Sequence, residues 1–407
     1  MRPINFAPAL IAAAVLAGCG GGGGGDQTPK VKFSSQVSFG DSLSDVGTYK
    51  VGTVAALGGG KFSINGPDSK NWTELMAAQF GLPAPCPAQT GLKGDATKGF
   101  SVPVVSHAGC TGYAQGSARV TNPVGPHSYQ LGDPIGLLTV PVITQIQTHL
   151  AANGGSFKGD EIVFVMAGGN DVFAQTGGLS AGAMAAATAA VTAAVPAQIQ
   201  TDIASGACVP ANATASNCQA PAVTKLTATV GAAAAAAYVK ANAPASVMAM
   251  GVAGGELATY VKTLIVGKGA KYVVVVNLPD VSQTPSGLAQ SAETRGLINA
   301  MVTTFNTQLK KGIDGDASIL YVDAYSVDRD QATNPGIYGL SNVSTPACDA
   351  NPVKNPLEGY ALTCTKANLI ASANEFFKFA DPVHPTPYTY LLLARLVSKD
   401  MITRGWL

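Results

Sequence analysis

Short apolar runs, bounded by charges and glycine, recur along the chain. Three of them, at 162–166, 272–276 and 319–322, consist almost entirely of Val, Ile, Leu, Met and aromatic residues, without polar alternation. Such runs are typical of strands that are buried on both faces, as in a parallel sheet. A fourth run, at 31–39, mixes β-branched with polar residues and predicts another strand, which leads to Gly40.

Helical spacing of apolar residues marks the segments between and beyond these strands. Strands that alternate with helices predict an α/β fold whose parallel sheet is covered by helices on both faces. The candidate helices lie at 71–80, 137–150, 297–309 and 391–401.

The segment 179–264 has a different composition, because it is rich in alanine and contains Gly231 followed by six alanines. It is longer than one crossover between two core strands needs, which predicts a helical insertion or lid and not a separate domain. Close helix packing is favoured over a membrane role for its small residues. Pro196 and Pro244 interrupt each apolar window before it reaches the length that spans a bilayer.

The first eighteen residues have the pattern of a signal peptide: Arg2, an apolar run at 9–16 and a small-residue end before Cys19. This end resembles a bacterial lipobox, which implies a lipid on Cys19. The alternative is ordinary cleavage, which would leave Cys19 as an odd thiol. Residues 19–35, with their glycine run, predict a flexible tether. We therefore expect an exported protein of the cell envelope, an outer-membrane lipoprotein held by this anchor or otherwise a secreted protein.

Composition and charge agree with export. Only 12% of the 407 residues are charged, and the net charge is +1, so the sequence offers no basic face for a nucleic acid. The remainder of the chain, 36–407, is predicted to be a single domain that contains the insertion.

Cysteines support an oxidising compartment as well. Without Cys19 an even number remains, which favours three disulfides in an exported protein. Sequential pairing is the simplest of the possible pairings, since each bridge then closes one local loop. The expected pairs are Cys86–Cys110, Cys208–Cys218 and Cys348–Cys364.

Two distant motifs supply the residue types of a nucleophilic site. Ser42 follows the first predicted strand in Gly-Asp-Ser-Leu at 40–43, and Asp381 precedes His384 by three residues. Serine attacks an ester only when a histidine takes its proton, and a carboxylate orients that histidine. Considered alone, Asp41 and Ser42 could equally cap a helix.

Other polar residues fit the same chemistry. Asn170 follows the strand at 162–166, where its amide could hydrogen-bond a developing oxyanion, although Gly-Gly-Asn-Asp is also turn chemistry. Gly116 has no side chain to keep a substrate from its backbone. The remaining histidines lack a nearby acid or metal-ligand spacing and are predicted to lie on the surface or in loops: His107, His127 and His149.

Four segments, at 40–47, 113–118, 168–171 and 381–386, resemble in order four sequence blocks of the GDSL or SGNH hydrolase family. The resemblance implies a flavodoxin-like α/β/α fold of three layers and needs no cofactor or metal. It implies a triad of Ser42, Asp381 and His384, and an oxyanion hole of Ser42, Gly116 and Asn170. The family's second block often has two glycines where this chain has Gly116-Ser117, which leaves open which N–H serves the hole.

The implied activity is hydrolysis of carboxylic esters through an acyl-enzyme. The family acts on lipid esters, acetylated sugars and aryl esters, and the sequence does not choose among them. Acyl transfer, phospholipase activity and a non-catalytic envelope lipoprotein that keeps the fold remain alternatives. The α/β-hydrolase fold is disfavoured, because its serine lies in Gly-x-Ser-x-Gly well inside the chain.

Overall fold

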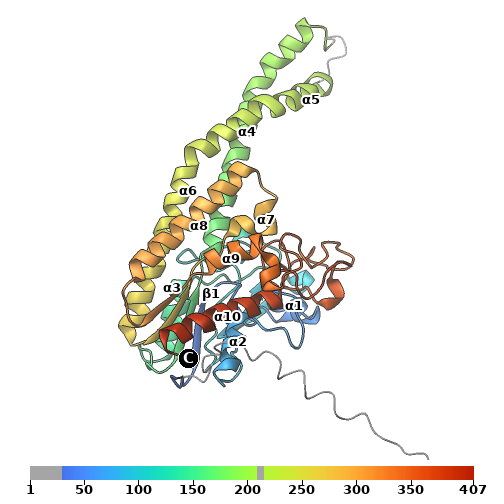
Figure 1. Ribbon diagram of the computed structural model, residues 1–407. Coiled ribbons are helices and arrows are strands. Elements are labelled where there is room, and N and C mark those ends of the chain that lie inside the picture. The colour runs from blue at the N-terminus through green and yellow to red at the C-terminus, as the bar shows by residue number, and fades with distance from the viewer. Residues whose placement is uncertain (1–29, 209–214) are drawn as a thin grey trace, which may run out of the picture.

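The structure, a computed structural model, describes residues 30–208 and 215–407. The predicted signal peptide, Cys19 and the glycine run lie outside these residues. Within them, an α/β body carries a long helical arm that projects from one side (Figure 1). The carboxyl-terminal helix packs along the body at the opposite end from the tip of the arm.

The body contains a four-stranded parallel sheet in the order β1-β4-β5-β6. Segment 111–113 lies on the free edge of β1, because Ser38 donates to the carbonyl of Thr111 (3.1 Å) and accepts from Tyr113 N–H (2.8 Å). Counted with this segment, the order is second, first, third, fourth, fifth, which is the flavodoxin-like order. The strands are β1 (Gln36–Gly40), β4 (Ile162–Met166), β5 (Tyr272–Val276) and β6 (Ile319–Val322).

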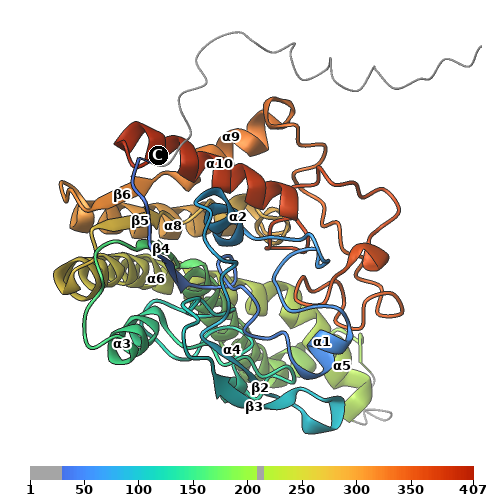
Figure 2. The ribbon, with the colours of Figure 1, turned by 90° about the horizontal axis from the view of Figure 1, so that it is seen from below.

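Helices cover both faces of this sheet (Figure 2). Alternate residues of β4 point to opposite faces, with Val163 and Val165 in one hydrophobic core and Phe164 in the other. The first core packs against α3 (Val142–Ala152), α6 (Ala232–Tyr260) and α8 (Ala292–Ile313), and the second against α2 (Trp72–Gln79) and α10 (Pro387–Arg404).

The predicted three-layer α/β fold is confirmed. The three apolar runs form strands with the predicted bounds, whereas the first strand begins at Gln36 and not at 31. Two further strands, β2 (Gln89–Lys93) and β3 (Ser101–Ser106), form an antiparallel pair beside the sheet. The other short helices are α1 (Gly52–Ala56), α7 (Pro285–Leu288) and α9 (Ala324–Thr333), with single turns η1 (Ala96–Lys98), η2 (Tyr129–Leu131), η6 (Val266–Lys268), η7 (Val281–Gln283), η8 (Pro335–Tyr338) and η9 (Lys366–Asn368).

All three expected disulfides are present: Cys86–Cys110, Cys208–Cys218 and Cys348–Cys364. The second of them joins the segment that follows α4 (Gly169–Ala204) to α5 (Ala215–Leu226) near the tip of the arm. Each bridge closes a local loop, and the chain-entropy account assigns such a loop about 3 kcal/mol of stabilisation.

The arm consists of α4 (Gly169–Ala204), α5 (Ala215–Leu226), the π-helical turn η4 (Thr227–Gly231) and the outer part of α6. At its body end, α6 continues into the π-helical turn η5 (Val261–Ile265). The prediction that Pro196, Pro244 and scattered polar residues keep every apolar window short of a membrane-spanning length was wrong, since α4 and α6 run through the prolines and lie in stretches long and apolar enough to span. A proline removes one intrahelical bond, and the surrounding alanines have the highest helix propensity.

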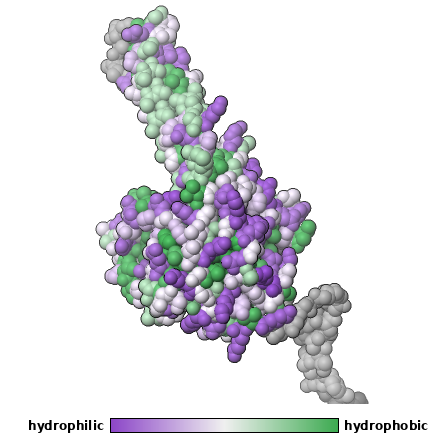
Figure 3. Space-filling view, turned by 90° about the vertical axis from the view of Figure 1, so that its left-hand side faces the viewer, coloured by the Kyte–Doolittle hydropathy of each residue, from purple (hydrophilic) through white to green (hydrophobic). Residues whose placement is uncertain are grey.

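Fewer strongly hydrophilic residues lie on the surface of the arm than on the surface of the body (Figure 3). In the described part of the chain, Gly169–Ala204 and Asn217–Lys268 are long and apolar enough to cross a membrane by length and composition alone. Only 22% and 17% of their most apolar windows are buried.

His149 was expected on the surface or in a loop, but it lies in the core. Its ring packs against the rings of Phe39, Tyr113 and Phe157 at centroid distances of 5.7, 5.4 and 4.5 Å. Burial, together with the charge of Lys158, lowers the pKa of His149 to about 4. His149 is buried because it lies on the same face of α3 as Gln145 and Ile146, and this face packs against the sheet.

We therefore expect His149 to make stability depend on pH. The unfolded chain binds a proton at this imidazole below about pH 6.5, whereas the folded chain does so only near pH 4. The contribution is thus present above pH 6.5 and is lost as the pH falls toward 4. Replacing His149→Gln should reduce the change in the urea-measured free energy of unfolding between pH 6.5 and pH 4 by about 3 kcal/mol. His107→Gln keeps His149 and should keep the slope; equal slopes in both variants would contradict the assignment.

Candidate active site

Ser42 is placed by the end of β1. Gly40 has φ +153°, and a Cβ there would lie 2.1 Å from the carbonyl oxygen of Met166, so only glycine allows β1 and β4 to approach at this edge. Gln145 of α3 donates to the Gly40 carbonyl and accepts from its N–H, both at 2.8 Å. Ser42 follows two residues later and is nearly buried.

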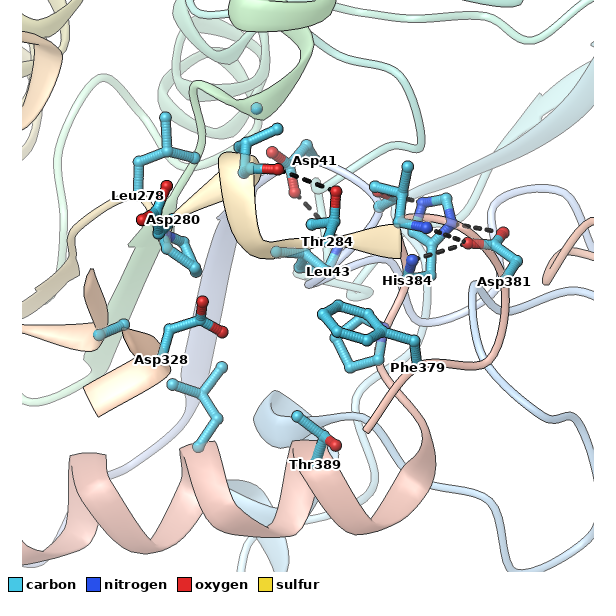
Figure 4. A pocket seen from close by; sticks show the side chains of 18 of the residues that line it. Asp41, Leu43, Leu278, Asp280, Thr284, Asp328, Phe379, Asp381, His384 and Thr389 are labelled. Atoms are coloured by element: carbon cyan, nitrogen blue, oxygen red, sulfur yellow. Dashed lines mark hydrogen bonds and ion pairs between the residues drawn. The ribbon is translucent and has the colours of Figure 1, made fainter. Parts of the chain in front are cut away.

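His384 and Asp381 reach Ser42 from the far end of the chain. The His384 Nε2 lies 3.0 Å from the Ser42 Oγ, and its Nδ1 lies 2.7 Å from Asp381 Oδ2. Asp381 also accepts from the backbone N–H groups of Val383 (2.8 Å), His384 (2.7 Å) and Ala361 (2.9 Å). Figure 4 shows this loop, with Asp381 and His384 joined at the side of the cavity.

Two buried carboxyl groups near His384 differ in their electrostatics. Burial alone would raise the pKa of Asp381, but the His384 imidazole and the hydrogen bonds that Asp381 accepts hold it below its ordinary value. Burial raises the pKa of Asp41 to about 7, although a hydrogen bond from Leu43 N–H and the His384 charge oppose this. Asp381 is thus the carboxylate that stays ionised beside the imidazole.

Asn170 lies in the first turn of α4, directly beyond β4 at the same sheet edge. Its Nδ2 donates to the carbonyl of Ala118 at 2.9 Å, which uses one of its two hydrogens and leaves the other for the cavity. The next residue, Asp171, accepts from Arg119 Nε (2.9 Å) and Val120 N–H (3.0 Å). These bonds tie α4 to the segment that follows Ser117.

The two candidate backbone donors, Gly116 and Ser117, have different environments. The Gly116 N–H donates to Asp45 Oδ2 at 2.9 Å, and a Cβ at Gly116 would lie 2.1 Å from the Phe62 ring. Ser117 has φ +64° and lines the cavity. Its N–H has no hydrogen-bond acceptor within residues 30–208 and 215–407.

Asp45 was not recognised from the sequence as part of the site. It is buried and accepts from the N–H groups of Gly47 (2.9 Å), Thr48 (2.8 Å) and Gly116. Burial raises its pKa to about 6, against the effect of these bonds. Asp45 therefore holds the segment of Gly116 beside that of Ser42. Its place three residues after Ser42 was visible, but its partner lies 71 positions away.

The cavity beside Ser42 has a volume of about 380 Å³, within the range of small-molecule sites. It extends from Ser42 and Asn170 toward α10, between Leu43, Phe379 and Leu393. Figure 4 shows Asp328 and Thr389 facing the space. Lys378 pairs with Asp328 at 2.8 Å.

Of the other two histidines, only His127 differs from expectation. His127 does have a nearby acid, because its Nδ1 lies 2.9 Å from Asp133 Oδ2, and it lines the same cavity as Ser42. His107 lies outside this cavity, with its Nε2 2.8 Å from the Thr90 hydroxyl. Within the described residues, no cluster of three or more His, Cys, Asp or Glu side chains could hold a metal ion.

The fold and this arrangement define a doubly wound α/β protein with a hydrogen-bonded Ser–His–Asp array at the carboxyl edge of its sheet. The family model described as GDSL-like lipase/acylhydrolase matches residues 37–397. The chain belongs to this family. Its four resembling segments therefore lie, in order, inside a match that spans most of the chain.

Individual relatives are distant. One GDSL esterase/lipase of Arabidopsis thaliana is 26% identical over 137 residues, which covers 31% of this chain and 36% of the relative. Another from the same plant is 30% identical over 101 residues, or 25% of this chain and 26% of the relative. The match thus spans about a third or less of the length of these curated relatives.

Proposed function

We propose that this protein hydrolyses carboxylic esters through an acyl-enzyme on Ser42, with His384 as the base and Asp381 as its orienting carboxylate. The observation that carries the proposal is the continuous pair of hydrogen bonds, 3.0 Å from Ser42 Oγ to His384 Nε2 and 2.7 Å from Nδ1 to Asp381. Family membership supports the reaction class.

In the first half of the reaction, His384 takes the Ser42 proton as Oγ attacks the ester carbonyl. The imidazolium then returns that proton to the leaving alcohol, and the acyl group stays on Ser42. Water repeats these steps and releases the acid. Asp381 keeps the Nδ1–H of His384 in place, and its lowered pKa supports its ionised state throughout.

Three N–H donors would stabilise the tetrahedral oxyanion: the second hydrogen of the Asn170 amide and the backbone N–H groups of Ser42 and Ser117. In this role we assign the N–H of Ser117 and not that of Gly116, because the Gly116 N–H donates to Asp45. Position 116 would instead require glycine, because a Cβ there would clash with the Phe62 ring. Such donors act strongly because they are oriented before charge develops.

The first prediction concerns the nucleophile. Ser42→Ala should abolish turnover of p-nitrophenyl butyrate and labelling by a fluorophosphonate, since among the described residues only the Ser42 hydroxyl is paired with His384. Ser101→Ala, at an exposed serine of β3, should retain both. Unchanged turnover in Ser42→Ala would overturn the proposal. A wild-type protein that neither turns over esters nor reacts with the probe would favour the non-catalytic lipoprotein.

The second prediction concerns Asn170. Asn170→Ala should lower kcat by about 100- to 1,000-fold, the usual cost of one oxyanion donor. The labelled fraction of Ser42 at long incubation should remain high, because the nucleophile and base are intact. A loss below tenfold, with the folded state verified by circular dichroism, would remove Asn170 from the oxyanion hole.

We further propose that residues 36–407 form one hydrolase domain, with 179–264 as a helical insertion, after a signal peptide at 1–18 and a tether at 19–35. A lipid on Cys19 would hold this domain at a membrane of the cell envelope. Cys19→Ala should then abolish palmitate incorporation and release the protein from the membrane fraction. A mature chain that begins at a residue other than Cys19 would contradict the anchor.

A further inference from the structure

His127 at the mouth of the cavity has an unusual backbone. Its φ is +57°, and only four non-glycine residues in the described part of the chain have a positive φ: Ser117, His127, Thr139 and Glu358. Two of the four, Ser117 and His127, line the cavity that contains Ser42. Strained backbone of this kind is retained where surrounding contacts enforce it, and it concentrates at functional sites.

Several contacts fix the orientation of His127. Its Nδ1 is bonded to Asp133 Oδ2 at 2.9 Å, and Asp133 Oδ1 accepts from the N–H groups of Ile135 (2.9 Å) and Gly136 (3.3 Å). The His127 carbonyl accepts from Leu137 N–H at 3.0 Å. With Nδ1–H donated to a carboxylate, the Nε2 of a neutral imidazole is an acceptor. The side chain is 45% exposed and lines the cavity, while its Nδ1 is occupied by Asp133.

Tyr360 lies between this histidine and the proposed catalytic one. Its ring centroid is 5.2 Å from that of His127 and 6.1 Å from that of His384. Burial raises the pKa of Tyr360 well above its ordinary value, so its hydroxyl keeps its proton near the Ser117 side chain. The rim thus combines an aromatic face, two hydroxyl groups and an imidazole acceptor.

The part of the cavity between Ser42 and α10 offers different chemistry. Leu43, Phe379 and Leu393 line the space between Ser42 and α10. In an acyl-enzyme reaction the acyl group must stay while the alcohol leaves and water enters. The apolar side chains between Ser42 and α10 suit the acyl chain, although Asp328 and Thr389 also face this space, and the side with His127, Ser117 and Tyr360 suits the alcohol.

Resting on the proposed esterase function, we propose that His127 binds a hydroxyl of the alcohol half of the substrate. The substrate class is an ester between an apolar acid and a neutral polyhydroxylated alcohol, such as glycerol or a sugar. In the complex, an alcohol hydroxyl donates to His127 Nε2, and the carbon face of the polyol lies against Tyr360.

Charge disfavours an anionic alcohol. The cavity is lined by four acidic side chains, Asp41, Asp280, Asp328 and Asp381, and by one lysine, Lys378, which is paired with Asp328. Asp133, which is bonded to the Nδ1 of His127, adds a further acidic side chain near the cavity. An alcohol that carries phosphate or carboxylate would approach these carboxylates without a free lysine or arginine lining the described cavity.

The test compares two butyrate esters in the wild-type protein and in His127→Ala. We expect the ratio of kcat/KM for glyceryl monobutyrate to that for p-nitrophenyl butyrate to fall roughly tenfold, as for the loss of one hydrogen bond. His107→Ala should leave the ratio unchanged. His127→Asn provides a second variant that tolerates a positive φ, in case alanine disturbs the loop. An unchanged ratio in both His127 variants, or a wild-type preference for butyrylcholine over glyceryl monobutyrate, would overturn the proposal.

A second measurement uses the reverse of the alcohol-release step. When p-nitrophenyl butyrate is hydrolysed in the presence of glycerol, a glycerol hydroxyl attacks the acyl-enzyme, a new C–O bond forms and the bond to Ser42 Oγ breaks. The proton of that hydroxyl passes through His384 to Oγ. The ratio of monobutyrin to butyrate should fall roughly tenfold in His127→Ala. An equal ratio in both proteins contradicts the rim site, whereas absent turnover in wild type contradicts the esterase function itself.

Discussion

The close approach of β1 and β4 at Gly40 is the constraint on which the site depends. Because no side chain separates Gly40 from the Met166 carbonyl, the ends of both strands meet at one edge of the sheet. That contact brings the segment of Ser42 beside the start of α4, where Asn170 lies. Gln145 then clamps Gly40 from α3 through both of its backbone groups. A larger residue at Gly40 would separate the strands and the groups they carry.

Buried carboxylates hold the surrounding loops against this edge. Asp45 joins its own turn to Gly116, Asp171 joins α4 to Arg119 and Val120, and Asp381 joins the histidine loop to Ala361. Each accepts backbone N–H groups that would otherwise be buried without partners, which is costly. The same burial raises the pKa of Asp41 and Asp45, while the imidazole lowers that of Asp381. One loop system therefore provides both the positions and the charge distribution of the site.

The helical arm begins at the same edge of the sheet. Asn170 lies in the first turn of α4, and the helix extends for 36 residues from that point, while α6 returns to pack on α8. Extra turns at the far end of such a hairpin lengthen the arm without moving its first turn. Beyond the body, the surface of the arm is mostly weakly to moderately hydrophobic (Figure 3).

Local signals in the sequence determined much of this protein. Continuous apolar runs located three strands, the order of the cysteines gave the disulfide pairs, and the close spacing of Asp381 and His384 marked a candidate acid–base pair, because these features depend on neighbouring residues. Only the tertiary structure decided that Asp45 occupies the Gly116 N–H, that His149 is a core residue and that His127 has Asp133 as a partner. These depend on which face of a helix is buried and on which loops meet, and hydrogen-bond partners many residues apart leave no periodic trace in the chain.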